Sequence, residues 1–207
     1  MHTAKLVWIT PDAEKLIGKI ARVSNPANED NPDVHGLLRY LIRHKHWSPF
    51  EMASMCVEIK TTRSVSPQIL RHRSFSFQEF SQRYSQVQEL TIPKLRSQDF
   101  KNRQNSRDDL PLETQQLWQE MIDNHNQQSL ALYQGLLEAG VAKECARDVL
   151  PTNAKTRLYM SGTIRSWLHF IDLRGANGTQ AEHRQIALQI GEILDTELPT
   201  VARAMWG

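Results

Sequence analysis

Residues 71–84 read RHRSFSFQEFSQRY and hold three arginines, one histidine, one glutamate, three serines and three phenylalanines. Arginine guanidinium groups are always charged and suit bidentate phosphate binding. Glu79 and Ser81 can hold a ribose or a base edge, and aromatic rings can support a flat ligand. The stretch therefore predicts a nucleotide-binding turn. From composition alone, a solvated salt-bridged surface with its phenylalanines in the core is an equally open interpretation.

The segments before this stretch predict alternating strands and helices. The apolar run 4–9 predicts a buried strand, and period-two alternation over 55–61 predicts another. Helices are expected from Pro11 to about Val23, from Asn31-Pro32 to Ile42, and from Ser66-Pro67 to Arg71. The 71–84 stretch then follows a strand–helix unit, on a turn that can aim many side chains at one cavity.

The segments after it are mostly helical. Residues 90–112 are polar and predict a flexible excursion. Helices are expected over about 113–139, 142–149 and 163–173, with a strand over 156–160. Thr179 and Glu182 predict a capping box that starts the last long helix. The pattern is that of an α+β fold with a small antiparallel or mixed sheet, several helices, and long helices in the C-terminal half.

Length and composition limit the class of protein. The 207 residues are expected to form one domain, 1–207, with room for a sizeable core. Net charge is only +2, less than a duplex-wrapping protein usually carries. No secretory signal and no apolar run of spanning length is present, which predicts a cytoplasmic protein without membrane contact. Cys56 and Cys145 are both expected to be buried structural thiols.

Five ordered blocks resemble the flavin-dependent thymidylate synthases. Arg71-His72-Arg73, seven residues and then Ser81 match that family's signature, with further matches at Ser76, Glu79, Arg83 and Tyr84. The other four blocks are ARVSN at 21–25, HWSPFE at 46–51, ARDVLP at 146–151 and RSWLHFIDLR at 165–174. A lone Arg-His-Arg match would be weak evidence for the family, whereas five matching blocks in the family's order are strong evidence.

The resemblance implies an enzyme that converts dUMP to dTMP. The carbon comes from 5,10-methylenetetrahydrofolate, and the hydride comes from FADH2, which NADPH regenerates. It also implies a homotetramer whose active sites combine residues of several subunits, with no nucleic-acid partner. In such an enzyme the cofactor carries the redox chemistry and the protein supplies position and electrostatics.

The resemblance also implies site residues. Arg174 matches the catalytic arginine that polarises the uracil ring, where a fixed cation meets developing negative charge. Arg147 matches an arginine that reaches the nucleotide from another subunit. The dUMP-binding positions are Gln68, Arg71, Glu79, Ser81, Gln82, Arg83, Arg147 and Arg174. The FAD-binding positions are His46, Ser48, Arg71, His72, Arg73, Glu79, Arg165 and His169.

Some positions depart from the family pattern or invite other interpretations. Met52, Gln78, Gln82 and the turn 177–183 differ from common family residues, which affects the expected fine contacts to the flavin. No metal site is expected, because His44 and His46 are two residues apart and should face apart. His183 and Arg184 are expected on a solvated helix face.

Two other functions compete with this enzyme. A nucleic-acid-binding module could use the same arginine and aromatic side chains to grip phosphates and stack bases. It would not explain matched blocks at His46, Arg147 and Arg174, and it would predict steep salt dependence of single-strand binding. The second competitor is a flavoprotein of the same fold with a different acceptor.

Overall fold

The structure is a computed structural model that describes residues 2–207. Its centre is a four-stranded antiparallel sheet with the strand order β1-β2-β6-β3. The strands are β1 Thr3–Ile9, β2 Ser54–Thr62, β6 Lys155–Thr163 and β3 Ser76–Glu79. Because β3 pairs with β6, part of the 71–84 stretch is an edge strand, and the prediction of a turn holds only on either side of it.

Helices make up most of the rest, so the predicted α+β class with long C-terminal helices is confirmed. The α-helices are α1 Ala13–Ala21, α2 His35–Arg43, α3 Ser66–Leu70, α4 Leu112–Glu138, α5 Lys143–Ala146, α6 Ile164–Arg174, α7 Ala181–Glu197 and α8 Pro199–Trp206. Three short 3₁₀ helices cover Pro26–Asn28, Ser48–Glu51 and Arg147–Val149. The polar excursion carries a small hairpin, β4 Ser97–Gln98 with β5 Ser106–Arg107.

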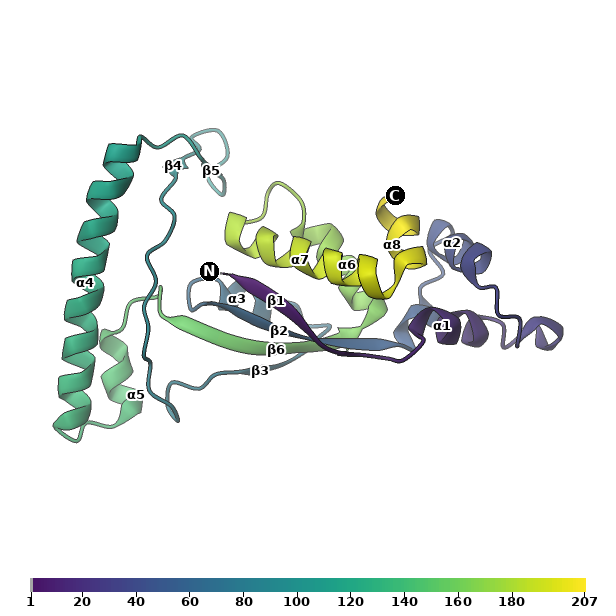
Figure 1. The fold of residues 1–207 in the computed structure, drawn as a ribbon, viewed down its shortest axis with the longest axis horizontal. Coiled ribbons are helices and arrows are strands. Elements are labelled where there is room, and N and C mark those ends of the chain that lie inside the picture. The colour runs from purple at the N-terminus through teal and green to yellow at the C-terminus, as the bar shows by residue number, and fades with distance from the viewer. Residues whose placement is uncertain (1) are drawn as a thin grey trace.

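The main core lies between the sheet and the helices on one of its faces. Figure 1 shows α6 and α7 lying along that face, with α1, α2 and α8 gathered at one end. Trp167 of α6 is fully buried, and its indole Nε1 donates to the carbonyl oxygen of Met55 at 3.0 Å. Alternate residues of β2 and β6, such as Ile59 and Leu158, point into this core and are fully buried. The opposite face is more polar, as expected for an antiparallel sheet with one covered face.

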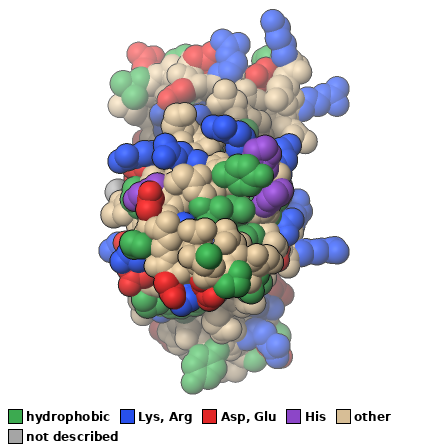
Figure 2. Space-filling model, turned by 90° about the vertical axis from the view of Figure 1, so that its right-hand side faces the viewer, with side chains coloured by type: hydrophobic (Ala, Val, Ile, Leu, Met, Phe, Trp, Pro, Cys, Tyr) green, Lys and Arg blue, Asp and Glu red, His purple; other side chains and the backbone are tan. Residues whose placement is uncertain are grey.

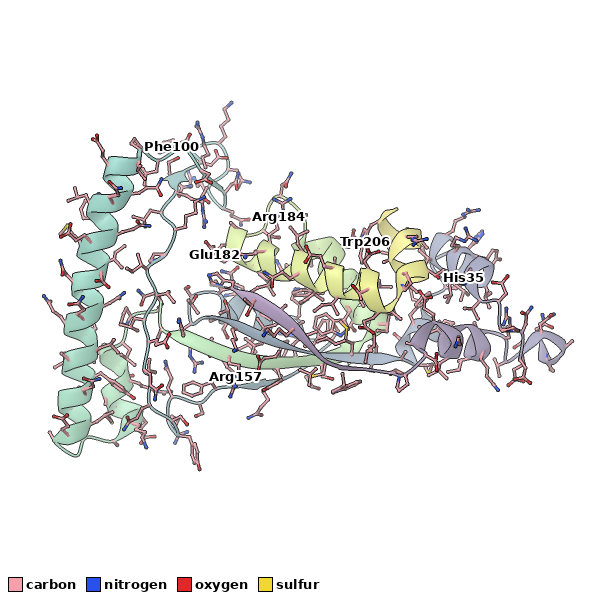
Figure 3. All side chains as sticks on the ribbon, viewed as in Figure 1. His35, Phe100, Arg157, Glu182, Arg184 and Trp206 are labelled. Atoms are coloured by element: carbon pink, nitrogen blue, oxygen red, sulfur yellow. The ribbon has the colours of Figure 1, made fainter. Side chains whose placement is uncertain are left out.

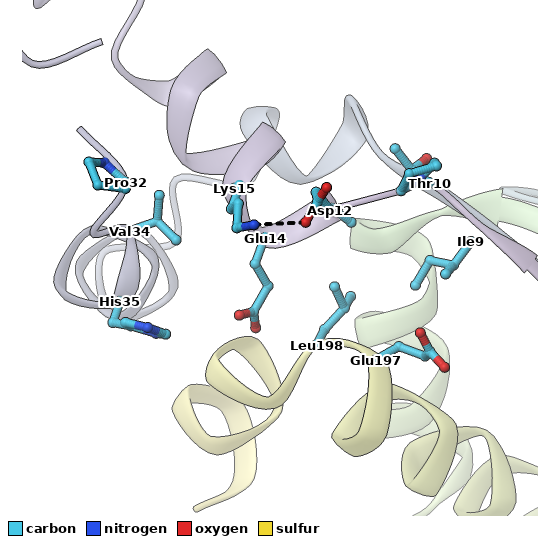
Figure 4. A pocket seen from close by; sticks show the side chains of 12 residues that line it. Ile9, Thr10, Asp12, Glu14, Lys15, Pro32, Val34, His35, Glu197 and Leu198 are labelled. Atoms are coloured by element: carbon cyan, nitrogen blue, oxygen red, sulfur yellow. Dashed lines mark hydrogen bonds and ion pairs between the residues drawn. The ribbon is translucent and has the colours of Figure 1, made fainter. Parts of the chain in front are cut away.

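The C-terminal helical segment breaks where the sequence predicted one helix. α7 ends at Glu197, and Pro199 begins α8 because proline is tolerated at a first helical position. The Glu14 carboxylate oxygen Oε1 accepts hydrogen bonds from the backbone N–H groups of Thr200 at 2.7 Å and Val201 at 2.9 Å. Figure 4 shows Glu14 pointing toward this helix end, beside a pocket of about 350 Å³. Glu14 therefore satisfies N–H groups that no side chain of α8 itself caps.

Helix α4 stands at the other end of the molecule, apart from the main core (Figure 1). Its second half packs on a small separate cluster, in which Tyr133 is buried and its hydroxyl accepts from the Val87 N–H at 3.3 Å. In its first half, Leu117 is 56% exposed and Met121 is 53% exposed, so this part of the helix leaves apolar side chains outside the core of the subunit. Residues 91–93 lie against another side of the helix, because the Gln119 amide donates to the Pro93 carbonyl oxygen at 3.3 Å and the Asn126 amide donates to the Thr91 carbonyl oxygen at 3.2 Å.

Two smaller predictions also need correction. α2 begins at His35 rather than Pro32, because the Asn31 side chain accepts from the Asp33 N–H in a turn instead of capping a helix. Cys56 is buried as predicted, but Cys145 is exposed on the short helix α5. Within residues 2–207, no helix combines the length and the apolar character that a membrane crossing needs.

Candidate active site

An arginine–histidine pair joins the end of α6 to the turn after α3. Arg174 is the last residue of α6, and its Nε donates to Nε2 of His72 at 2.8 Å. His72 is 8% exposed, and burial together with the charges of Arg174 and His169 lowers its pKa to about 4. The imidazole is therefore neutral at pH 7 and can accept this hydrogen bond. The contact orients the guanidinium and leaves its two terminal nitrogens for a ligand.

His183 lies in the same cluster, although the sequence predicted a solvated position for it. The side chain is fully buried on α7, and the Phe170 ring lies 4.9 Å from the His72 ring and 5.7 Å from the His183 ring. Burial, Arg174 and His72 lower the pKa of His183 to about 4. Neither ring nitrogen has a hydrogen-bond partner within residues 2–207. Its helical spacing with the buried residues Ile186, Ala187 and Ile190 is the signal that could have placed it inside.

Glu79 is fixed at the end of β3 by three donors on one carboxylate oxygen. Ser66 donates to Oε1 at 2.6 Å, Thr156 donates at 2.8 Å, and the Arg63 guanidinium lies 2.9 Å away. Oε2 of Glu79 is thereby held in a defined direction, which suits the predicted contact to a nucleotide. No motif predicts a role for Arg63, because this residue lies outside every matched block.

The predicted phosphate-binding residues form a second group near α5. Arg83 pairs with Glu144 of α5 at 3.0 Å, and Nε of Arg147 donates to the Glu144 carbonyl oxygen at 3.3 Å. Ser81 starts the turn in which Arg83 lies, because its carbonyl oxygen accepts from the Ser85 N–H at 2.9 Å. Gln82 is in the same turn and is half-buried. Within residues 2–207, no hydrogen bond or ion pair joins this group to Arg174 or His72.

A cavity of about 490 Å³ is lined by two of the predicted flavin-binding positions, Arg165 and His169. Its lining includes Trp47, Ser74, Arg165 and His169. Arg165 also pairs with Glu51 at 2.5 Å, which ties α6 to the 3₁₀ helix that begins at Ser48. This cavity therefore lies next to the arginine-rich turn, because Ser74 follows Arg73 directly.

The side chains around this cavity fit a group with phosphates and a flat ring. Arg71 and Arg73 are both exposed and form no ion pair within residues 2–207. His46 is exposed, with its ring centroid 6.0 Å from Tyr40 and 6.1 Å from His44. Figure 2 shows histidines beside hydrophobic side chains, flanked by Lys and Arg, on the end of the molecule that carries α1 and α2. Guanidinium groups can bind the phosphates of a dinucleotide, and exposed aromatic rings can stack on a flat ring.

A larger cavity, about 1100 Å³, was not predicted from the sequence. It lies against the more open face of the sheet, where Phe80 and Tyr84 meet a basic wall of Lys5, Lys60, Lys143, Lys155 and Arg157. Such a wall favours anionic ligands. The basic residues are scattered over three strands and one helix, so only the sheet register brings them together.

The amino-acid sequence is similar to those of known enzymes over almost its whole length. Residues 5–200 match the family described as thymidylate synthase complementing protein. A probable flavin-dependent thymidylate synthase of Paramecium bursaria Chlorella virus 1 is 50% identical over 212 residues, covering 98% of each chain. The flavin-dependent thymidylate synthase of Synechocystis sp. is 50% identical over 192 residues, covering 93% of this chain and 89% of the relative.

The chain belongs to the flavin-dependent thymidylate synthase family. A solved member of the same fold is the UMP/dUMP methylase PolB from Streptomyces cacaoi bound with 5-Br dUMP. It has a TM-score of 0.86 and 28% identity, covering 99% of this chain and 94% of PolB. Membership in the flavin-dependent thymidylate synthases confirms the resemblance predicted from the sequence, and it favours an enzyme over a nucleic-acid-binding module.

Proposed function

We propose that this protein methylates dUMP to dTMP, with 5,10-methylenetetrahydrofolate as carbon donor, FAD as cofactor and NADPH as reductant. The observation that carries the proposal is the Arg174–His72 pair, in which a neutral buried histidine orients a guanidinium beside the arginine-rich turn. A fixed cation stabilises the negative charge that develops on a uracil ring when C5 becomes nucleophilic. Arg174 is the proposed catalytic residue.

The remaining nucleotide contacts follow from the two groups of side chains. Glu79 and Gln68 take the sugar or base, since both are held by protein hydrogen bonds. Arg71, Ser81, Gln82, Arg83 and Arg147 supply donors for the phosphate. Ser81 acts in binding rather than as a nucleophile, because no general base is hydrogen-bonded to its hydroxyl within residues 2–207.

FAD is proposed to lie at the cavity next to Ser74 and against the exposed rings of α2. His46, Ser48, Arg165 and His169 would hold the ring end, and Arg71 and Arg73 would bind the pyrophosphate. His72 and Glu79 act from behind by fixing the turn that carries those arginines. When bound, the flavin supplies the hydride that completes the methyl group.

The proposed enzyme is a single-domain subunit of a cytoplasmic homotetramer. Support comes from the separation of the two residue groups, because Arg83 and Arg147 are attached to α5 while Arg174 ends α6. Figure 1 shows α5 beside α4, at the opposite end of β6 from the start of α6. A second copy that brings its own α5 segment would complete the site.

The first experiment is an absorption spectrum of the purified, desalted protein, followed by addition of dUMP. The proposal expects flavin bands near ~450 nm that shift when dUMP binds, since both ligands share one cavity. Formation of dTMP from dUMP, 5,10-methylenetetrahydrofolate and NADPH should follow. A protein that takes up no added FAD would contradict the proposal.

Sharing of the site between copies predicts complementation. Arg147→Ala and Arg174→Ala enzymes should each be inactive alone, but co-expression should restore part of the activity. The reason is that some sites then combine an intact Arg147 from one copy with an intact Arg174 from another. Co-expression of Arg174→Ala with Arg71→Ala is the comparison for positions that would come from the same copy. Failure of the Arg147/Arg174 pair to recover any activity would argue against a shared site.

A further inference from the structure

A chain of polar side chains connects the hairpin β4–β5 with the predicted nucleotide-binding residue Gln68. Arg96 donates to Oε1 of Glu182 at 2.6 Å, and Nε2 of Gln180 donates to Oε2 of Glu182 at 2.8 Å. Nε2 of Gln68 in turn donates to Oε1 of Gln180 at 2.5 Å. We call these four side chains the Arg96 relay.

The ion pair in this relay is shielded from water. The Arg96 and Glu182 side chains are 17% and 16% exposed, the least exposed ion pair within residues 2–207. Figure 3 shows Glu182 at the end of α7 that faces the hairpin. Arg96 is also held from the hairpin side, because its Nε donates to the Ser106 hydroxyl at 2.8 Å. The predicted capping box of Thr179 and Glu182 is therefore wrong, since the Glu182 carboxylate binds Arg96 and Gln180 instead.

The charge on Glu182 fixes the direction of every hydrogen bond in the relay. Burial alone would raise the pKa of this carboxyl, but the hydrogen bonds from Arg96 and Gln180 hold it below its usual value. An ionised carboxylate only accepts, so Gln180 must turn its NH2 group toward it. The Gln180 carbonyl oxygen then faces Gln68, which must offer its own NH2 group. The Gln68 amide thereby keeps its oxygen as the acceptor for another molecule.

We propose that Arg96 is a positioning residue for the nucleotide, which acts through Glu182 and Gln180 to present the Gln68 carbonyl oxygen to a hydrogen-bond donor of dUMP. The chemical class of that donor is a sugar hydroxyl or the imide N–H of the base, because an ionised phosphate only accepts. This inference rests on the proposed function of the same site. It also assigns a role to the polar segment 90–112, because the hairpin within this segment holds Arg96 in place.

The test measures dUMP binding to the FAD-loaded enzyme by calorimetry. Arg96→Met should raise the Kd for dUMP about tenfold, as expected for loss of a shielded charged hydrogen bond. KM for dUMP should rise more than kcat falls, and Arg96→Lys should recover part of the affinity. Glu182→Gln, which keeps the shape but frees the amides to reverse, should weaken dUMP binding to a similar degree. Lys94→Met is the matched control, because Lys94 pairs with Asp108 in the same segment but outside the relay.

A double-mutant cycle separates positioning from general stability. If Arg96 acts through Gln68, Arg96→Met should cause no further rise in Kd when Gln68 is already alanine. Additive losses, or equal Kd values for the wild type and Arg96→Met, would overturn the inference alone. A wild-type enzyme that binds FAD but no dUMP would overturn the proposed function and this inference with it. FAD content and the unfolding midpoint of each variant show whether it has folded.

Discussion

Arg174→Ala is expected to lower kcat/KM for dTMP formation by about 10³ while FAD stays bound. Removal of one preorganised donor aimed at developing negative charge costs roughly 10²–10³ in rate in other enzymes, and a full cation in a partly buried site belongs at the upper end. Arg174 is held by His72 at 2.8 Å, so its position is set before the substrate arrives. The measurement is steady-state dTMP formation, together with the flavin absorbance of the desalted protein.

Arg174→Lys sharpens this experiment. One ammonium group cannot both donate to His72 and reach the base as the planar guanidinium can, so this variant should retain the charge but lose most of the rate. Arg203→Ala is a suitable control, because Arg203 is an exposed arginine of α8 and lies outside the proposed site. Near-normal turnover by Arg174→Ala would remove this residue from the catalytic role.

Acid is expected to destabilise the protein well before its carboxylates are protonated. His72 and His183 have folded-state pKa values of about 4, against an ordinary value of 6.5. Between these values the unfolded chain binds more protons than the folded chain, so stability is complete above pH 6.5 and falls as the pH approaches 4. Each histidine accounts for roughly 3 kcal/mol at the low end of this window. Urea unfolding at one protein concentration and several pH values measures the slope.

His183→Leu separates the two histidines. It removes one titrating group and two buried nitrogens that have no hydrogen-bond partner among the described residues 2–207, so the acid slope should become shallower. At pH 7.5 the variant should be at least as stable as the wild type, because an apolar side chain of similar size replaces unsatisfied polar atoms. His125→Leu is the matched control on the exposed face of α4. Identical acid slopes for His183→Leu and the wild type would show that His183 does not titrate in this range.

The sequence predicted the elements of this fold well because their signals are local. Alternation over 55–61 became β2, and the helix predicted over 163–173 became α6. The edge strand Ser76–Glu79 was missed because its partner β6 lies far along the chain, and no local pattern reports that pairing. The break at Leu198 was missed for the same reason, since the cap of α8 comes from Glu14.

The residues of the candidate site were predicted from motifs. The residues and hydrogen bonds that hold them in position were not. Arg174 and His72 could be named in advance, but their mutual hydrogen bond depends on how α3 packs near α6. The prediction for His183 is wrong because a histidine next to an arginine is typical of a polar surface, although its spacing matches the buried face of α7. Arg63 and Arg96 carried no signal, because each acts through a carboxylate that is distant in sequence.

The pairing of β2 with β6 determines when the chain can fold during its synthesis. Ser54 pairs with Thr163 and Thr62 pairs with Lys155, so the two central strands are separated by the whole middle of the chain. Pairings between such distant residues must overcome a large loop-closure entropy and form slowly. A ribosome must therefore translate β6 and the helices that cover it before the sheet can close. Until then, the apolar face of β2 is exposed on the nascent chain and is a natural target for chaperones.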